Sequence, residues 1–224
     1  MSTQLDPLDS IIYCALLYEL GPALEAARVP ADDEIVFSHR FKPTADGHLY
    51  DPSLNWKHFV DACRSKMNGG SVTHVVVADI SDFFHRLYHH RVQNALNAAT
   101  NGSSQARIMF KLLDQWAGTP SYGIPVGPSP SRLIAEVTLD DVDQYLRAEG
   151  ADLLRFSDDY RIFCTSRKDA YDKLSALALS LFQNQFVDDR LGLGLEVLVV
   201  DLFIGICGES DQVDELLESQ GEIF

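Results

Sequence analysis

Residues 153–164 read LLRFSDDYRIFC and place two adjacent carboxylates, Asp158 and Asp159, between two short apolar runs. This pattern predicts a tight β-hairpin with the acids at its turn. Acidic pairs also occur at 32–33, 140–141 and 188–189, so a pair by itself carries little information. The apolar flanks distinguish the pair at 158–159, and a third carboxylate is needed to give it a function.

Asp79 is the candidate third carboxylate, because it follows a β-branched run at 75–77 that predicts a buried strand. If the hairpin pairs beside this strand, the carboxylates of both converge on one edge of a sheet. Such a cluster suits two divalent cations roughly 3.5 to 4 Å apart, one activating an attacking hydroxyl and one stabilising a leaving oxygen. Hard oxygen ligands favour Mg²⁺, with Mn²⁺ as the alternative. Without a cation, adjacent carboxylates repel each other and one tends to protonate.

The rest of the chain predicts helices and further strands around this centre. Apolar spacing predicts a first helix over 5–20 that Gly21-Pro22 interrupts, followed by a strand over 34–43. Further helical segments are expected at 56–67, 83–96, 105–116, 131–146 and 170–185, and a β-like segment at 191–207. Together these elements predict an α+β fold, in which an antiparallel sheet is backed by helices.

Composition and charge limit the classes of function. The chain has 224 residues, enough for one large or two small domains, and 46% of them are hydrophobic. No apolar run approaches the roughly 20 residues that span a bilayer, and the N-terminus lacks a signal-peptide pattern, so we expect a cytoplasmic protein without a membrane partner. The net charge of −15 argues against nucleic-acid binding. However, residues 188–224 hold ten acids and one base, so the remainder carries only −6 and is compatible with a local basic groove.

Three segments, in order, resemble the catalytic motifs of reverse transcriptases. The first motif is similar to VVADISDFF at 76–84, the Gly-rich second motif to SYGIPVGPSPSRLIAE at 121–136, and the third motif to RFSDDYRIF at 155–163. The likeness covers about residues 75–163 and extends, more weakly, to FSHRFKP at 37–43. The combination of DISDFF with GIPVG is most similar to the bacterial non-mobile, defence-associated branch, which includes abortive-infection polymerases.

The resemblance implies a metal site and a gate for the sugar. It makes Asp79 and Asp158 the main metal ligands and catalytic residues, with Asp159 at the matching turn position. Phe84, five residues after Asp79, corresponds to the steric gate, whose ring would clash with a ribose 2′-hydroxyl. Deoxynucleotides are therefore the implied substrates.

The resemblance also implies residues that bind the substrate. The second motif brings the template and the incoming base close to a backbone without bulky side chains. In the fingers of the family, basic residues neutralise the triphosphate. The matching positions here are Gly123, Pro125, Gly127 and Ser131 for the second motif, and Arg40 and Lys42 for the fingers.

The implied activity is RNA-directed DNA polymerisation, in which a primer hydroxyl attacks the α-phosphate of a deoxynucleotide, with a role in antiphage defence. The implied fold is a polymerase palm with partial fingers and no apparent thumb. We divide the chain into an N-terminal helix and fingers-like region at 1–74, a palm at 75–207 and an acidic tail at 208–224. The implied partners are an RNA template, a DNA primer or product, deoxynucleoside triphosphates, and a noncoding RNA or a second protein subunit.

The sequence departs from the family pattern in three places. Val126 stands where many reverse transcriptases have a glutamine that faces the incoming sugar, no lysine-bearing fourth motif is recognisable, and little chain follows the third motif to form a thumb. Template-independent DNA synthesis and a catalytically silent nucleic-acid-binding or assembly subunit therefore stay open. A metal-dependent phosphodiesterase is disfavoured, because the Gly-rich motif would then have no purpose.

Several single residues also have simpler interpretations. The pair Asp188-Asp189 resembles a third motif, but it follows a long predicted helix instead of a hairpin. Phe84 could be a core residue, and Arg40 could pair with a local acid. His85 and His89 are four residues apart, but without the helical glutamate of a zinc protease motif a surface or capping role is preferred.

Overall fold

A four-stranded antiparallel sheet lies at the centre of the computed structural model, which describes residues 3–117, 121–184 and 195–201. The strands follow the order β2-β3-β1-β4, and each neighbouring pair is antiparallel. Their bounds are β1 His74–Ile80, β2 Asp152–Phe156, β3 Asp159–Cys164 and β4 Leu195–Asp201. Every residue of β3 is buried, as expected for an inner strand that is covered on both faces.

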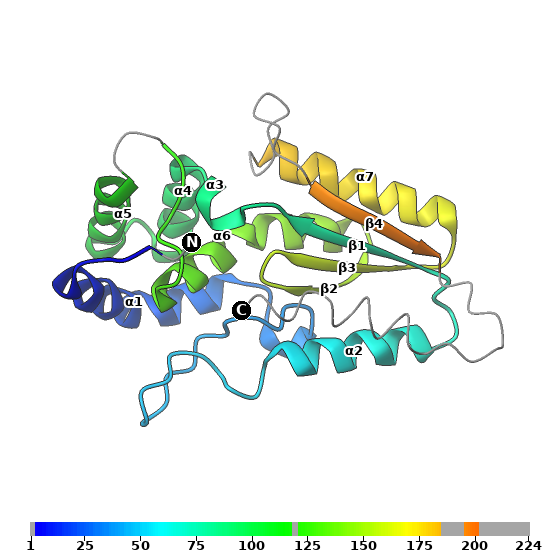
Figure 1. Ribbon diagram of the computed structural model, residues 1–224, viewed down its shortest axis with the longest axis horizontal. Coiled ribbons are helices and arrows are strands. Elements are labelled where there is room, and N and C mark those ends of the chain that lie inside the picture. The colour runs from blue at the N-terminus through cyan, green and yellow to red at the C-terminus, as the bar shows by residue number, and fades with distance from the viewer. Residues whose placement is uncertain (1–2, 118–120, 185–194, 202–224) are drawn as a thin grey trace.

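Helices cover both faces of this sheet, and Figure 1 shows α7 and α2 on opposite sides of it. Helices α6 and α7 share a core with Val76 and Ala78 of β1, whereas α2 packs through Phe59 against Val75 and the other face. Neighbouring β1 residues thus enter different cores, which is the two-residue period of a strand. The helices are α1 Pro7–Ala27, the 3₁₀ turn η1 Ala31–Asp33, α2 Trp56–Asn68, α3 Phe83–Arg86, α4 His89–Thr100, α5 Ser104–Ala117, α6 Ser129–Ala148 and α7 Arg167–Gln183.

Strands β2 and β3 form the predicted hairpin. Phe156 pairs with Asp159, so the turn consists of Ser157 and Asp158. β3 pairs with β1 as far as Ala78↔Tyr160, which brings the start of β3 beside the end of β1. The hairpin turn and the end of β1 therefore meet at one edge of the sheet, as the sequence predicts.

Helix α1 continues through Gly21-Pro22, where the sequence predicts an interruption. That prediction is wrong, because tertiary packing offsets the helical hydrogen bond that Pro22 removes. Leu17 and Leu24, on either side of the proline, are both fully buried in the core. Gly21 in turn makes room for a neighbour, since a Cβ atom there would meet the ring of Phe41 at 2.2 Å.

Two other predicted elements also differ. The segment 34–43 is not a strand and forms only isolated bridges within the described residues, because Ser38 and Arg40 use their side chains in a buried polar network. The segment 83–96 is divided at Leu87 and Tyr88 into α3 and α4. The adjacent phenylalanines at 83 and 84 thus lie on the short helix α3.

The α+β class and the antiparallel sheet backed by helices are confirmed. The helices expected at 56–67, 105–116, 131–146 and 170–185 are confirmed as α2, α5, α6 and α7, and β4 lies within the β-like segment at 191–207. The rival acidic pair at 188–189 and the tail at 208–224 lie outside the described residues. Among the described helices, none is long and apolar enough to cross a membrane.

Candidate metal centre

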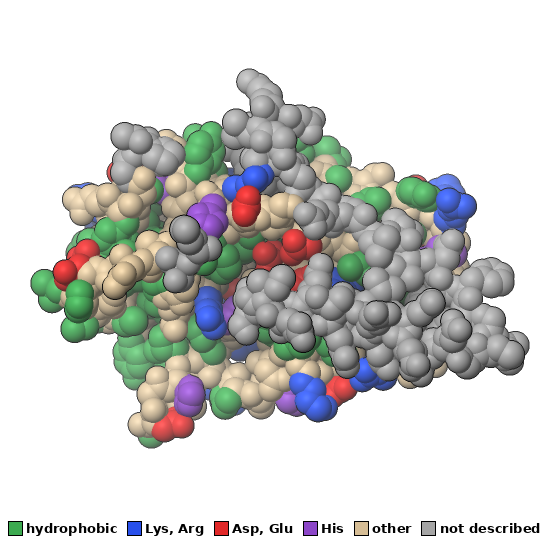
Figure 2. All heavy atoms as spheres, viewed as in Figure 1, with side chains coloured by type: hydrophobic (Ala, Val, Ile, Leu, Met, Phe, Trp, Pro, Cys, Tyr) green, Lys and Arg blue, Asp and Glu red, His purple; other side chains and the backbone are tan. Residues whose placement is uncertain are grey.

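Three carboxylates meet where the hairpin turn reaches the end of β1. Asp79, Asp158 and Asp159 each offer one oxygen atom, and these oxygens lie within 4.8 Å of one another. Asp159 is buried, whereas the other two are partly exposed, so the cluster is accessible from solvent. Figure 2 shows acidic side chains gathered near the middle of one face, over the turn between β2 and β3. The structure brings the three residues together, and their role as ligands stays a prediction.

The electrostatics of this cluster favour a bound cation. Burial, reinforced by the charge of Asp79, raises the pKa of Asp158 to about 7. Burial also raises the pKa of Asp159, although Arg161 opposes that shift. Among the described residues, the buried Oδ1 atom of Asp158 has no hydrogen-bond partner. A divalent cation would provide that partner and offset the repulsion, so the oxygen ligands present fit Mg²⁺ or Mn²⁺.

Metal affinity should therefore rise with pH through neutrality. The pKa of Asp158 is about 7 without a cation, and a cation binds only the ionised carboxylate. Protons therefore compete with the cation for Asp158 below pH 7 and compete little above pH 7. We expect the apparent Kd for Mn²⁺ to fall about tenfold between pH 6 and pH 8. Electron paramagnetic resonance of free Mn²⁺ measures this directly. Asp152→Asn, which removes an exposed carboxylate from the same hairpin, should keep the profile; a flat profile in the wild type would contradict the assignment.

Arg161 is a neighbour of the cluster that the sequence analysis did not single out. Its Nη1 atom donates to Asp159 Oδ1 at 3.3 Å, and the guanidinium lies over the ring of Phe59. This positive charge competes with a cation for Asp159, which leaves Asp79 and Asp158 as the stronger candidate ligands. The alternation of side chains along a strand puts residues 159 and 161 on the same face, and this was the available signal.

The first and second predicted motifs are joined by backbone hydrogen bonds. Ile124 N–H donates to the carbonyl of Phe84 at 2.9 Å, and Gly123 N–H donates to the carbonyl of Leu87 at 2.9 Å. His89 is buried, and its Nε2 atom donates to the carbonyl of Gly123 at 2.8 Å. Phe84 is half-buried beside the core residue Phe83 and packs against the core.

Gly123 lies at a position in this loop that leaves little room for a side chain. Its φ is +87°, and an added Cβ would lie 3.0 Å from the backbone oxygen of His85. Gly102 is a matched control, because its φ is +66° but no atom lies within 4 Å of its Cβ position. We expect Gly102→Ala to destabilise the protein by about 1–2 kcal/mol through backbone strain alone, and Gly123→Ala by about 2–4 kcal/mol through strain plus overpacking. Urea unfolding measures both, and equal losses would contradict the role of the His85 contact.

The other predicted substrate residues lie in different surroundings. Pro125 is buried, Gly127 is exposed, and Ser131 is buried with its hydroxyl 2.9 Å from Tyr13 Oη. Lys42 is exposed and pairs with Asp51 at 2.7 Å. Arg40 is buried and pairs with Glu25 at 2.9 Å, which confirms the alternative that it bonds a local acid. The role of these residues in substrate binding stays a prediction.

A cavity of about 530 Å³ lies next to the hairpin. Its walls include His39 and Tyr50 from the segment after α1, Arg132 from α6 and Phe156 from β2. Phe156 pairs with Asp159, so the cavity adjoins the carboxylate cluster through the end of β2. Nucleobases stack on aromatic rings, and phosphates bind to exposed arginines, so these walls suit a nucleotide.

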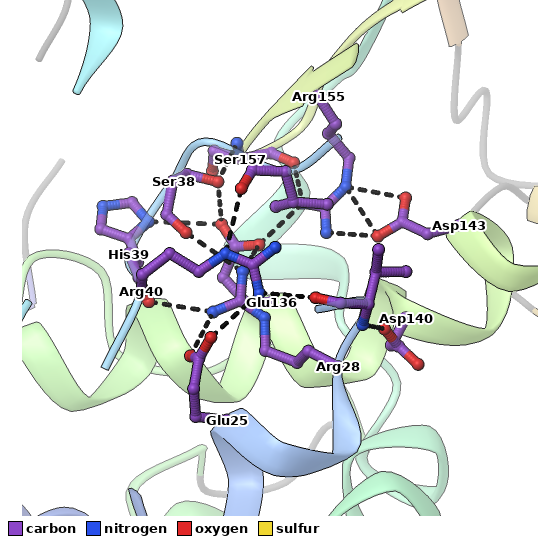
Figure 3. A network of polar contacts seen from close by, with 12 residues as sticks. Glu25, Arg28, Ser38, His39, Arg40, Glu136, Asp140, Asp143, Arg155 and Ser157 are labelled. Atoms are coloured by element: carbon purple, nitrogen blue, oxygen red, sulfur yellow. Dashed lines mark hydrogen bonds and ion pairs between the residues drawn. The ribbon is translucent and has the colours of Figure 1, made fainter. Parts of the chain in front are cut away.

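A buried ion-paired network lies behind the hairpin turn, and sequence reasoning did not find it (Figure 3). At its centre, the buried Arg155 pairs with Asp143 at 2.6 Å and with Glu136 at 2.9 Å. Burial alone would raise the pKa of Glu136, but Arg155 and Arg28 hold it well below its usual range. The available signal was a charged residue inside an apolar run, as in LLRF for Arg155 and LIAEVTL for Glu136.

Comparison with known proteins identifies a family model that matches the chain and a solved structure with a similar fold. A family model described as reverse transcriptase (RNA-dependent DNA polymerase) matches residues 34–188. A structure of apo telomerase from Candida tropicalis, truncated from its C-terminal domain, is similar with a TM-score of 0.50 at 12% sequence identity. The alignment covers 88% of this chain but 41% of the telomerase chain, so this chain spans less than half of that protein, and the likeness concerns the fold alone. The search of curated proteins found no match.

Proposed function

The chain belongs to the reverse transcriptase family, and we propose that it is a nucleotidyltransferase that extends a DNA primer with deoxynucleotides on an RNA template. The observation that carries this proposal is the meeting of three carboxylate oxygens within 4.8 Å at the hairpin turn. Acidic clusters alone have many roles, but the three carboxylates of this one lie within the range that matches the family model. We keep the division at 1–74, 75–207 and 208–224 as part of the proposal.

In this mechanism a primer 3′-hydroxyl attacks the α-phosphate, a new P–O bond forms, and the bond to the β-phosphate bridge breaks to release pyrophosphate. Asp79 and Asp158, with Asp159, would hold two divalent cations. When bound, these cations would stabilise the negative charge on the attacking oxygen and on the leaving oxygen. Phe84 would line the sugar site, and the loop at Gly123, which is tied to Phe84 through Ile124, would support the base pair. The cavity beside Phe156 supports binding of nucleic acid next to the cluster.

An incorporation assay tests the proposal. The full chain would be incubated with Mg²⁺ or Mn²⁺ and labelled deoxynucleotides, with a primed RNA template, with unprimed RNA and without nucleic acid. The control is the double variant Asp158→Ala plus Asp159→Ala. We expect template-dependent incorporation that the double variant lacks. No incorporation by folded wild-type protein under any of these conditions would contradict the proposal.

The same assay separates the alternatives. Incorporation without a template would favour template-independent synthesis, which the resemblance to abortive-infection polymerases suggests. Nucleic-acid binding without incorporation would favour a catalytically silent subunit, and cleavage of the nucleic acid would favour a phosphodiesterase. The antiphage role and the cytoplasmic location stay predictions from the sequence.

Replacing Phe84 should relax the choice of sugar. If its half-buried ring occupies the space of a 2′-hydroxyl, Phe84→Ala should raise the ratio of ribonucleotide to deoxynucleotide incorporation by about 10- to 100-fold. Phe84→Tyr keeps the ring and should keep the ratio near that of the wild type. Single-nucleotide incorporation with each substrate measures both ratios. An unchanged ratio in Phe84→Ala would assign Phe84 to the core and not to the sugar site.

A further inference from the structure

Ser157, which precedes Asp158 in the hairpin turn, is held by side chains through both of its backbone polar groups. Its φ of +55° lies in the left-handed region, which a residue with a side chain adopts at a cost. Its N–H donates to Ser38 Oγ at 2.8 Å, and its carbonyl accepts from Arg155 Nη1 at 2.6 Å. That carbonyl belongs to the peptide bond with Asp158, so these two contacts fix the backbone from which the Asp158 carboxylate extends.

Both holding side chains are themselves bound by Glu136 of α6. Ser38 donates its hydroxyl proton to Glu136 Oε1, so its lone pairs remain for the Ser157 N–H. Arg155 donates to Glu136 Oε2 at 2.9 Å from the same Nη1 atom that holds the Ser157 carbonyl. Figure 3 shows Ser38 and Arg155 approaching Glu136 from different segments of the chain, with the turn beside them.

The outer contacts of the network restrict the motion of these groups. Asp143 accepts three hydrogen bonds from Arg155, two from Nε and one from Nη2, which fixes the plane of the guanidinium. Arg28 donates to Glu136 Oε2 at 2.8 Å and to the carbonyl of Ser38 at 3.1 Å. The positive charges of Arg28 and Arg155 thus face the negative charges of Glu136 and Asp143 inside the protein, and the set is fully buried.

We propose that Ser38, Glu136 and Arg155 are positioning residues that orient Asp158 for metal binding. The inference rests on the proposed function, because that function makes Asp158 a metal ligand. Groups that hold a ligand residue typically change metal affinity by about 10- to 100-fold when they are removed. A network that served the fold alone would instead change stability and leave the metal affinity of the folded protein unaltered.

The test compares Mn²⁺ binding in full-length variants, well below their melting temperatures. Ser38→Ala removes the acceptor of the Ser157 N–H, and Arg155→Lys keeps the charge but cannot hold the turn and Asp143 together. The matched control is Ser180→Ala, which removes another buried serine hydroxyl, on α7 and outside the network. We expect the Kd for Mn²⁺ to rise at least about tenfold in Ser38→Ala and Arg155→Lys and to stay unchanged in Ser180→Ala. Amide hydrogen exchange at Ser157 should also become faster in Ser38→Ala.

Each outcome separates this inference from the proposed function. If the wild type binds Mn²⁺ and both variants bind it equally well, the positioning role is wrong while the proposed function stands. If the wild type binds Mn²⁺ with the expected variant effects but incorporates no nucleotide, the positioning role is supported and the polymerase proposal fails. If the wild type binds no Mn²⁺, the positioning role and the proposed function are both overturned.

Discussion

Asp158→Asn should strongly reduce nucleotide incorporation and, at the same time, stabilise the protein in metal-free buffer. The carboxylate lies within 4.8 Å of the oxygens offered by Asp79 and Asp159, and its buried Oδ1 has no partner among the described residues. Asparagine keeps the shape but removes the charge, so it relieves the repulsion and weakens metal binding together. We expect incorporation to fall by about 10²- to 10³-fold or more, as when one preorganised electrostatic group is removed.

The stabilisation has a defined dependence on pH. Asp158 has a pKa of about 7 in the folded protein, above the value of about 3.9 in an unfolded chain. Between these two values the folded state binds the extra proton, so the wild type loses stability as the pH rises from 4 to above 7. The advantage of Asp158→Asn should thus be near zero at pH 4 and reach roughly 2–4 kcal/mol at pH 8.

Thermal unfolding of both proteins at pH 5 and pH 8, with and without Mn²⁺, measures this effect. Mn²⁺ should raise the melting temperature of the wild type and hardly that of Asp158→Asn, because only the wild type retains the full ligand set. Asp152→Asn, on the exposed side of the same hairpin, should change neither stability nor incorporation appreciably. A variant that was less stable than the wild type at pH 8 would show that Asp158 is not under electrostatic strain.

The sequence was sufficient to predict the carboxylate cluster because local patterns determine each of its parts. The run at 75–77 specifies a buried strand, and LLRFSDDYRIF specifies a hairpin with two residues at its turn. Antiparallel pairing with β1 then leaves little freedom in where Asp79, Asp158 and Asp159 lie. The sequence predicts both acids at the turn, but Asp159 is the first residue of β3 and only Asp158 of the two lies in the turn.

The sequence was insufficient where long-range contacts override local preference. Nothing near Pro22 indicates that buried leucines on both sides will keep α1 continuous. Likewise, the strand predicted over 34–43 fails because Ser38 and Arg40 bond to Glu136 and Glu25, partners that lie 98 and 15 residues away. A polar network of this kind has no period in the sequence, so it appears only as charged residues at positions where apolar ones are expected.

Arg155→Ala should produce the largest loss of stability among single substitutions in the network. The arginine is fully buried, and its removal leaves Asp143 without its three bonds from the Arg155 guanidinium and Glu136 with one fewer. Breaking a buried ion pair by removing one partner typically costs about 3–5 kcal/mol, since the remaining charge stays desolvated. By contrast, Arg147→Ala removes a partly exposed pair with Asp33 and should cost about 1 kcal/mol or less. Urea unfolding at pH 7 measures both values.

The pH dependence and a paired substitution identify the cause of this loss. Arg155 lowers the pKa of Glu136, so its removal allows the Glu136 carboxylate to take up a proton more readily. Protonation neutralises Glu136, and the loss of stability in Arg155→Ala should be smaller at pH 5 than at pH 8. Combining Arg155→Met with Asp143→Leu removes the charges on both sides and should recover part of the loss, because apolar replacements of a buried pair are often neutral. If the double variant is as unstable as Arg155→Ala at both pH values, the loss comes from packing around the arginine and not from the unpaired charge.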